Sequence, residues 1–89
     1  MFSISVSYFL DEAGILFFNT WFEKVSALVS LQEGYVSIAS EVDFIANPKV
    51  YLSFINKDKL TAWANTKSHD ELVLELQKYY IKPHQVEFL

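Results

Sequence analysis

The fold is decided by one stretch of the chain, VYLSFINKDKLTAWANTKSHDELVLELQKYY, residues 50–80. Its first part alternates as a strand does, and the apolar residues of one face are Val50, Leu52 and Phe54. A helical segment carrying Trp63 follows, opened by an N-cap signal at residues 56–58. After a break at residues 65–66, Ser68 and Glu71 form a capping-box pattern ahead of a leucine-rich helix. The stretch therefore predicts a strand followed by two short helical segments.

Four further elements are predicted on either side of this stretch. Residues 2–8 alternate apolar side chains with serines, which predicts a half-buried strand. Residues 11–34 predict a helix that begins near Asp11 and has Gly34 as its C-terminal cap. Its apolar stripe comprises Phe18, Trp21, Phe22, Val25, Leu28 and Val29. Residues 35–44 predict a second strand that returns through an Asn-Pro turn, and residues 84–89 predict a last strand with Val86 and Phe88 facing inward.

The order strand, helix, strand, strand, helix, strand predicts a single α+β domain over residues 1–89. It is the ferredoxin-like βαββαβ pattern, in which right-handed crossovers place the helices on one face of a four-stranded antiparallel sheet. The other sheet face then lacks a cover. We therefore expect a homodimer in which two such sheets pack face to face.

Composition limits the possible partners. The chain has 89 residues, 52% of them hydrophobic and 17% aromatic, more than one small core readily buries. Its net charge of −4, with lysines as its only basic residues apart from two histidines, argues against nucleic-acid binding. No cysteine is present, which excludes disulfides and thiolate metal sites. No signal peptide or membrane span is recognised, so the expected location is the cytoplasm.

In element order and in several motifs the chain resembles the antibiotic biosynthesis monooxygenase family. The resemblance covers nearly the whole chain and rests on residues 33–35 at the entry to the second strand, on strand 50–55, and on residues 58–63 followed by Ser68-His69. The spacing Trp63-x5-His69 is similar to one found in many members after the third strand. The resemblance implies that two ferredoxin-like units of this kind form a dimeric α+β barrel.

The resemblance also implies an activity, the oxygenation of a small planar phenol or quinol by molecular oxygen without a bound cofactor. In the members that oxidise aromatic polyketides, the tryptophan similar to Trp63 has an asparagine one turn earlier and a tyrosine six residues later. Lys59 and His69 occupy those positions here. In haem-degrading members the iron ligand falls near Val73, which cannot coordinate, so haem is disfavoured.

The candidate catalytic residues are His69, as a general base, and Trp63, as a wall for a flat aromatic ligand. Histidine changes charge near neutrality, which suits proton transfer. The predicted substrate-binding residues are Phe18, Phe22, Tyr51 and Phe54. No metal site is predicted, because no set of ligands has metal-binding spacing.

Each candidate also has a purely structural interpretation. Trp63 at helical spacing is typical of a core anchor, and His69 of a partly exposed residue at a helix start. His84, after Pro83, is interpreted as a surface residue. The alternative to an enzyme is therefore a non-catalytic dimeric protein that binds a small ligand or acts in a stress response.

Overall fold

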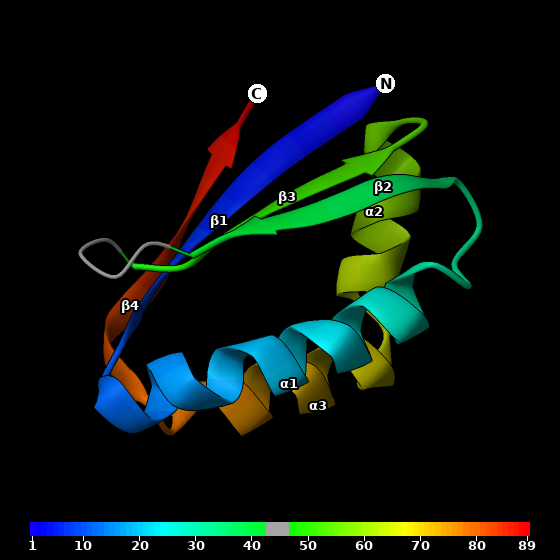
Figure 1. The fold of residues 1–89 in the computed structure, drawn as a ribbon. Coiled ribbons are helices and arrows are strands. Elements are labelled where there is room, and N and C mark those ends of the chain that lie inside the picture. The colour runs from blue at the N-terminus through cyan, green and yellow to red at the C-terminus, as the bar shows by residue number, and fades with distance from the viewer. Residues whose placement is uncertain (43–46) are drawn as a thin grey trace.

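The computed structural model describes residues 1–42 and 47–89, which form a sheet with helices along one side (Figure 1). Part of the second predicted strand and of its turn, residues 43–46, lies outside the described residues. The elements in chain order are β1 Phe2–Leu10, α1 Glu12–Val29, β2 Tyr35–Glu41, β3 Lys49–Phe54, α2 Lys57–Ala64, α3 Lys67–Gln77 and β4 Tyr80–Phe88.

The four strands form one antiparallel sheet in the order β2-β3-β1-β4. The predicted ferredoxin-like α+β fold is thereby confirmed, including the pairing of β2 with β3. The second helical region is two helices, α2 and α3, with the break where the sequence predicts it. All three helices lie on the same side of the sheet (Figure 1).

The core lies between the sheet and these helices. On β3 every second residue is buried, as the alternation predicts. The α1 stripe is confirmed at four of its positions, which are Phe18, Trp21, Val25 and Val29. From α2 and α3 the buried residues are Trp63, Leu72 and Leu76. One apolar layer therefore joins every helix to the sheet.

Two predicted helix caps are wrong. Thr66, not Ser68, caps α3, because its hydroxyl oxygen accepts a hydrogen bond from the His69 backbone N–H at 3.1 Å. Gly34 does not cap α1, which ends at Val29 with Ser30 as its C-cap. Gly34 instead has a φ of 84° at the entry to β2, a left-handed conformation that favours glycine. Two neighbouring hydroxyl residues such as Thr66 and Ser68 can each cap a helix, and the one whose side chain reaches a free backbone N–H group becomes the N-cap.

The last strand begins earlier and is more exposed than predicted. β4 starts at Tyr80 and contains Pro83, which an edge strand tolerates because one of its sides has no ladder to join. Val86 and Phe88 pair with Val6 and Ile4, so they do point to the helix side. Their exposed fractions are nevertheless 47% and 71%, so the prediction that they face inward into the core is wrong.

The sheet face away from the helices was expected to need a second sheet as a cover, but it is largely polar. Ser3 and Ser53 pair across β1 and β3 there, and their hydroxyl oxygens lie 2.7 Å apart. Ser5 on the same face is 2% exposed, although no helix covers it. Glu41 and Tyr51 lie on this face too and are hydrogen-bonded at 2.7 Å. Small and paired polar groups, not an apolar surface, therefore form this face.

We predict that Gly14→Ala destabilises the protein by about 1–3 kcal/mol, because a methyl group would overpack the junction of α1 with β1. A Cβ at Gly14 would lie 2.6 Å from the Tyr79 Cβ and 3.0 Å from the Leu10 Cβ. Helix propensity alone predicts the opposite sign, a gain of roughly 1 kcal/mol. Urea unfolding measures the change, with Thr20→Ala on the exposed side of α1 as the matched control. A more stable Gly14→Ala variant would contradict the close contact.

Candidate functional site

A cavity of about 90 Å³ lies within the layer between the sheet and the helices. Its lining is almost entirely apolar and comes from β1, β2, β3 and all three helices. The lining residues are Ile4, Val6, Tyr8, Trp21, Val25, Ile38, Val50, Leu52, Leu60, Trp63, Ala64, His69, Leu72 and Val73. Several of those on α2 and α3, including His69, are only half-buried, so the cavity reaches solvent beside these helices.

Trp63 and His69 meet at this cavity. Their ring centroids are 5.6 Å apart and the rings are nearly perpendicular, at 81°. The short turn between α2 and α3 sets this contact, because Thr66 accepts from His69 N–H at one helix start and donates its hydroxyl to the Trp63 carbonyl oxygen at 2.8 Å. The His69 Nδ1 lies 3.5 Å from the Asp70 carboxylate. The two predicted catalytic residues are thus neighbours in space.

The four predicted substrate-binding residues do not line the cavity. Phe18 and Phe54 are fully buried in the core, and Phe22 stacks on Phe18 with centroids 6.1 Å apart. Tyr51 lies on the opposite face of the sheet, because strand alternation separates it from its neighbours Val50 and Leu52. There its hydrogen bond to Glu41 raises the Tyr51 pKa. The walls of this cavity are therefore aliphatic residues and other aromatic residues.

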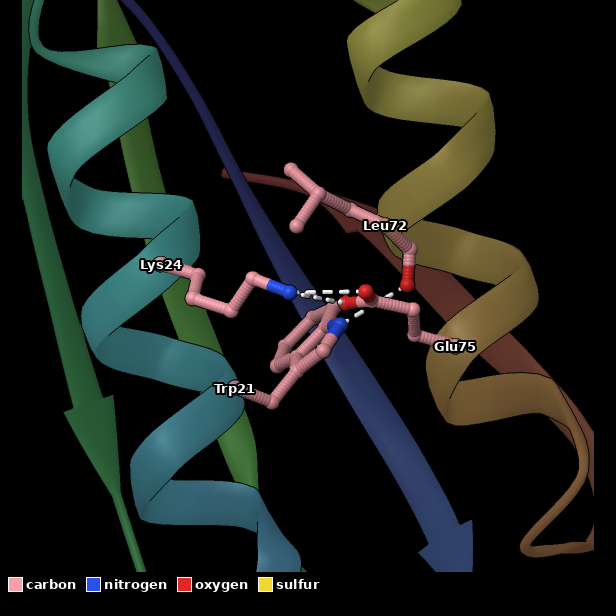
Figure 2. A network of polar contacts seen from close by, with 4 residues as sticks. All are labelled: Trp21, Lys24, Leu72 and Glu75. Atoms are coloured by element: carbon pink, nitrogen blue, oxygen red, sulfur yellow. Dashed lines mark hydrogen bonds and ion pairs between the residues drawn. The ribbon is translucent and has the colours of Figure 1, made fainter.

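Two aromatic residues of the lining, Tyr8 and Trp21, are not among the predicted substrate-binding residues. Trp21 belongs to the predicted apolar stripe of α1, and its indole N–H donates to the Leu72 carbonyl oxygen at 2.8 Å (Figure 2). Tyr8 continues the alternation of β1 and is 8% exposed. The alternation places it on the buried face, but only the fold brings it to the cavity. Burial, and to a lesser extent the neighbouring Tyr80, raise the Tyr8 pKa.

His84 is not the surface residue that the sequence suggested. It is half-buried, its Nδ1 lies 2.9 Å from the Tyr80 hydroxyl, and its ring centroid lies 5.9 Å from that of Tyr8. Burial lowers the His84 pKa below its ordinary value, and the charge of nearby His69 lowers it further. Burial also raises the pKa of Tyr80 to about 12. The pair thus stays neutral near pH 7, beside Tyr8.

In the part of the chain that the structure describes, no group of three acidic, histidine or cysteine side chains could hold a metal ion. Within the same residues, no helix combines the length and the apolar composition that crossing a bilayer requires.

Comparison with solved structures identifies close structural neighbours. A crystal structure of an antibiotic biosynthesis monooxygenase superposes with a TM-score of 0.88 at 11% identity, covering 100% of this chain and 96% of that one. A variant of SnoaB, a cofactor-independent oxygenase from Streptomyces nogalater, gives 0.81 at 11% identity over 97% and 89% of the two chains. A protein of unknown function from Nitrosomonas europaea gives 0.83 at 11% identity over 99% and 85%.

No protein-family model matches the sequence, and no curated protein matches it either. The chain therefore has the fold of the antibiotic biosynthesis monooxygenases, as the motifs suggested, and at 11% identity the likeness is one of fold. A shared fold does not by itself carry a shared activity, since function depends on the residues of the site.

We predict that acid destabilises the protein in part through His84. Because its pKa is lowered in the folded state, the unfolded chain binds more protons once the pH falls below about 6.5. This contribution to stability is complete above that value and is lost as the pH falls toward the folded-state pKa. Thermal unfolding between pH 7.5 and 5.5 should show a falling midpoint in the wild type and a smaller fall in His84→Asn, whose side-chain oxygen can still accept from Tyr80.

His69→Gln is the matched control, because it removes the other histidine. In that variant the fall should persist but become smaller, since the charge of His69 contributes to the His84 shift. An identical pH dependence in the wild type and in His84→Asn would contradict this assignment.

Proposed function

We propose that this protein is a cofactor-independent monooxygenase that acts on a small planar phenol or quinol bound at the cavity. The observation that carries the proposal is the contact between Trp63 and His69 at the wall of an otherwise apolar cavity. An apolar cavity with a few polar groups is the usual form of a small-molecule site. The neighbours of known name support the reaction class, because one is a cofactor-independent oxygenase.

In this proposal His69 is the general base and Trp63 is the wall against which the aromatic ring packs. The Asp70 carboxylate beside His69 Nδ1 favours a proton on that nitrogen, which leaves Nε2 free to accept a proton from the substrate. Asp70 is largely exposed, so this orienting effect is weak. The edge-to-face contact with Trp63 holds the imidazole ring in addition.

The proposed reaction balances without an external reductant. His69 removes the phenolic proton, and the electron-rich phenolate carbon forms a C–O bond with dioxygen. His69 returns the proton to the outer peroxide oxygen, and the resulting hydroperoxide loses the ring C–H proton as its O–O bond breaks, which leaves a quinone and one molecule of water. The two electrons that reduce the second oxygen atom come from the substrate itself, so no metal, flavin or haem has to supply them.

The proposal extends to the assembly and the location of the protein. We propose a homodimer that packs through the open sheet faces, in the manner of a dimeric α+β barrel, with residues 1–89 as one domain of each subunit in the cytoplasm. The small side chains of that face, which include Ser3, Ser5 and Ser53, would allow two sheets to approach closely.

We predict that the protein consumes oxygen when supplied with a single-ring quinol, and that His69→Gln lowers the rate by roughly 10²–10⁴-fold, the usual contribution of a general base. An oxygen electrode measures the rate. Glu71→Gln is the matched control, because Glu71 is exposed on the same helix and does not line the cavity. It should retain the full rate.

Ligand binding separates the chemical role of His69 from a structural one. His69→Gln should bind the quinol nearly as tightly as the wild type while reacting slowly. Absence of oxygen uptake with every quinol tested, together with retained binding, would replace the proposed enzyme by the non-catalytic ligand-binding protein. Stoichiometric haem binding with a shifted Soret band would overturn the proposal in favour of a haem protein.

We predict a dimer at micromolar concentration in sedimentation velocity. Ala39→Lys, on the open sheet face opposite Tyr51, should shift the protein toward monomer because it would bury an unpaired charge in the interface. Ala62→Lys, which is exposed on α2, is the matched control and should leave the dimer intact. A wild-type monomer at these concentrations would contradict the proposed assembly.

A further inference from the structure

The cavity offers very few polar groups to a ligand. Among its described lining residues only four side chains contain nitrogen or oxygen, which are Tyr8, Trp21, Trp63 and His69. The Trp21 indole N–H is already donated to the Leu72 carbonyl oxygen. Three side chains are therefore left to orient a ligand, two from the helices and one, Tyr8, from the sheet.

Tyr8 is held rigidly by its neighbours. Its ring makes an edge contact with Trp21 at 5.3 Å and tilted contacts with Phe18 at 6.2 Å and Tyr80 at 6.3 Å between centroids. The residue is 8% exposed, and no hydrogen bond joins its hydroxyl to another group among residues 1–42 and 47–89. The hydroxyl oxygen is not fully enclosed, because the Ser26 hydroxyl is the one fully buried side-chain polar atom without a partner in that part of the chain. The Tyr8 hydroxyl is therefore a free donor at the wall of the cavity.

The nearest polar side chains do not satisfy Tyr8, because they satisfy each other. Tyr80 and His84 are hydrogen-bonded at 2.9 Å. With His84 neutral, its Nδ1 can accept a hydrogen bond from the Tyr80 hydroxyl. The two groups thus form their hydrogen bond without the Tyr8 hydroxyl. Burial also keeps Tyr8 protonated across the physiological range, so its hydroxyl stays a donor.

We propose that the Tyr8 hydroxyl donates a hydrogen bond to an oxygen atom of the ligand and thereby selects single-ring aromatic compounds that carry an acceptor oxygen. The inference rests on the proposed function for the place where the ligand binds, and adds the residue that fixes its orientation. With Tyr8 on the sheet and the Trp63–His69 pair on the helices, the ring is held between the two layers. The Tyr8 hydroxyl then donates its hydrogen bond to the oxygen substituent at which the ligand reacts.

The size of the cavity supports the restriction to one ring. An engineered apolar cavity of roughly 150 Å³ admits benzene. The volume here is about 90 Å³, so a single ring fits only in part and a fused ring system does not fit inside. Discrimination must then come mainly from the polar contact, because little apolar surface is available to distinguish one small ring from another.

The test compares phenol with toluene, two molecules of nearly equal shape, in Tyr8→Phe and in the wild type. Chemical-shift titration measures both dissociation constants without any turnover. We expect the wild type to favour phenol and Tyr8→Phe to lose about 3–10-fold of that preference, the value of one hydrogen bond, with toluene affinity unchanged. Tyr80→Phe is the matched control, because it removes a neighbouring hydroxyl that is already paired, and should keep the preference.

Thermal unfolding of the free protein gives a second, independent readout. Tyr8→Phe should unfold at nearly the same temperature as the wild type, because the Tyr8 hydroxyl makes no hydrogen bond within the described residues, whereas Tyr80→Phe should unfold at a lower one. A clearly lower midpoint for Tyr8→Phe would show a structural partner and overturn the inference. An unchanged phenol preference in Tyr8→Phe, or no saturable binding of either compound to the wild type, would also overturn it.

Failure of this inference is distinguishable from failure of the proposed function. Phenol selectivity that depends on Tyr8, without oxygen uptake, overturns the monooxygenase and leaves the role of Tyr8 standing. Oxygen uptake that depends on His69, together with a phenol preference that Tyr8→Phe leaves unchanged, supports the monooxygenase and overturns the role of Tyr8.

Discussion

The arrangement of this protein depends on one buried hydrogen bond, from the Trp21 indole N–H to the Leu72 carbonyl oxygen, which joins α1 to α3 (Figure 2). The salt bridge between Lys24 and Glu75 spans the same two helices at 2.7 Å. Both of its partners are about half exposed, and such pairs contribute little, roughly 0–1 kcal/mol. The buried bond is therefore the stronger constraint. Because Trp21 and Leu72 also line the cavity, it fixes two of the cavity walls at once.

The sequence could predict what depends on neighbours along the chain. Alternation identified β1 and β3, and the 3.6-residue period identified the buried stripe of α1, because burial on one face imposes both patterns. The resemblance of the motifs to one family predicted the fold as well. Helix boundaries were less accurate. Thr66 and Ser68 are both good caps, and their choice depends on which hydroxyl reaches a free N–H group.

The site depended on contacts that no local pattern records. The predicted spacing brought Trp63 and His69 together because only one tight turn separates their helices. Tyr51 was placed at the cavity although the alternation that buries Leu52 turns Tyr51 to the other face. His84 approaches Tyr8 only through the pairing of β4 with β1, whose register shifts between Ser7 and Phe9. An irregular register of this kind leaves no clear signal in the sequence.

The cavity itself argues for a ligand. Its lining is almost entirely apolar, and it reaches solvent beside α2 and α3. Removing apolar surface from water is favourable, so a molecule that covers this lining gains free energy on binding. Tyr8, Trp63 and His69 add the few polar groups by which small-molecule sites orient a ligand. The lining is therefore better matched to an aromatic molecule bearing oxygen than to water alone.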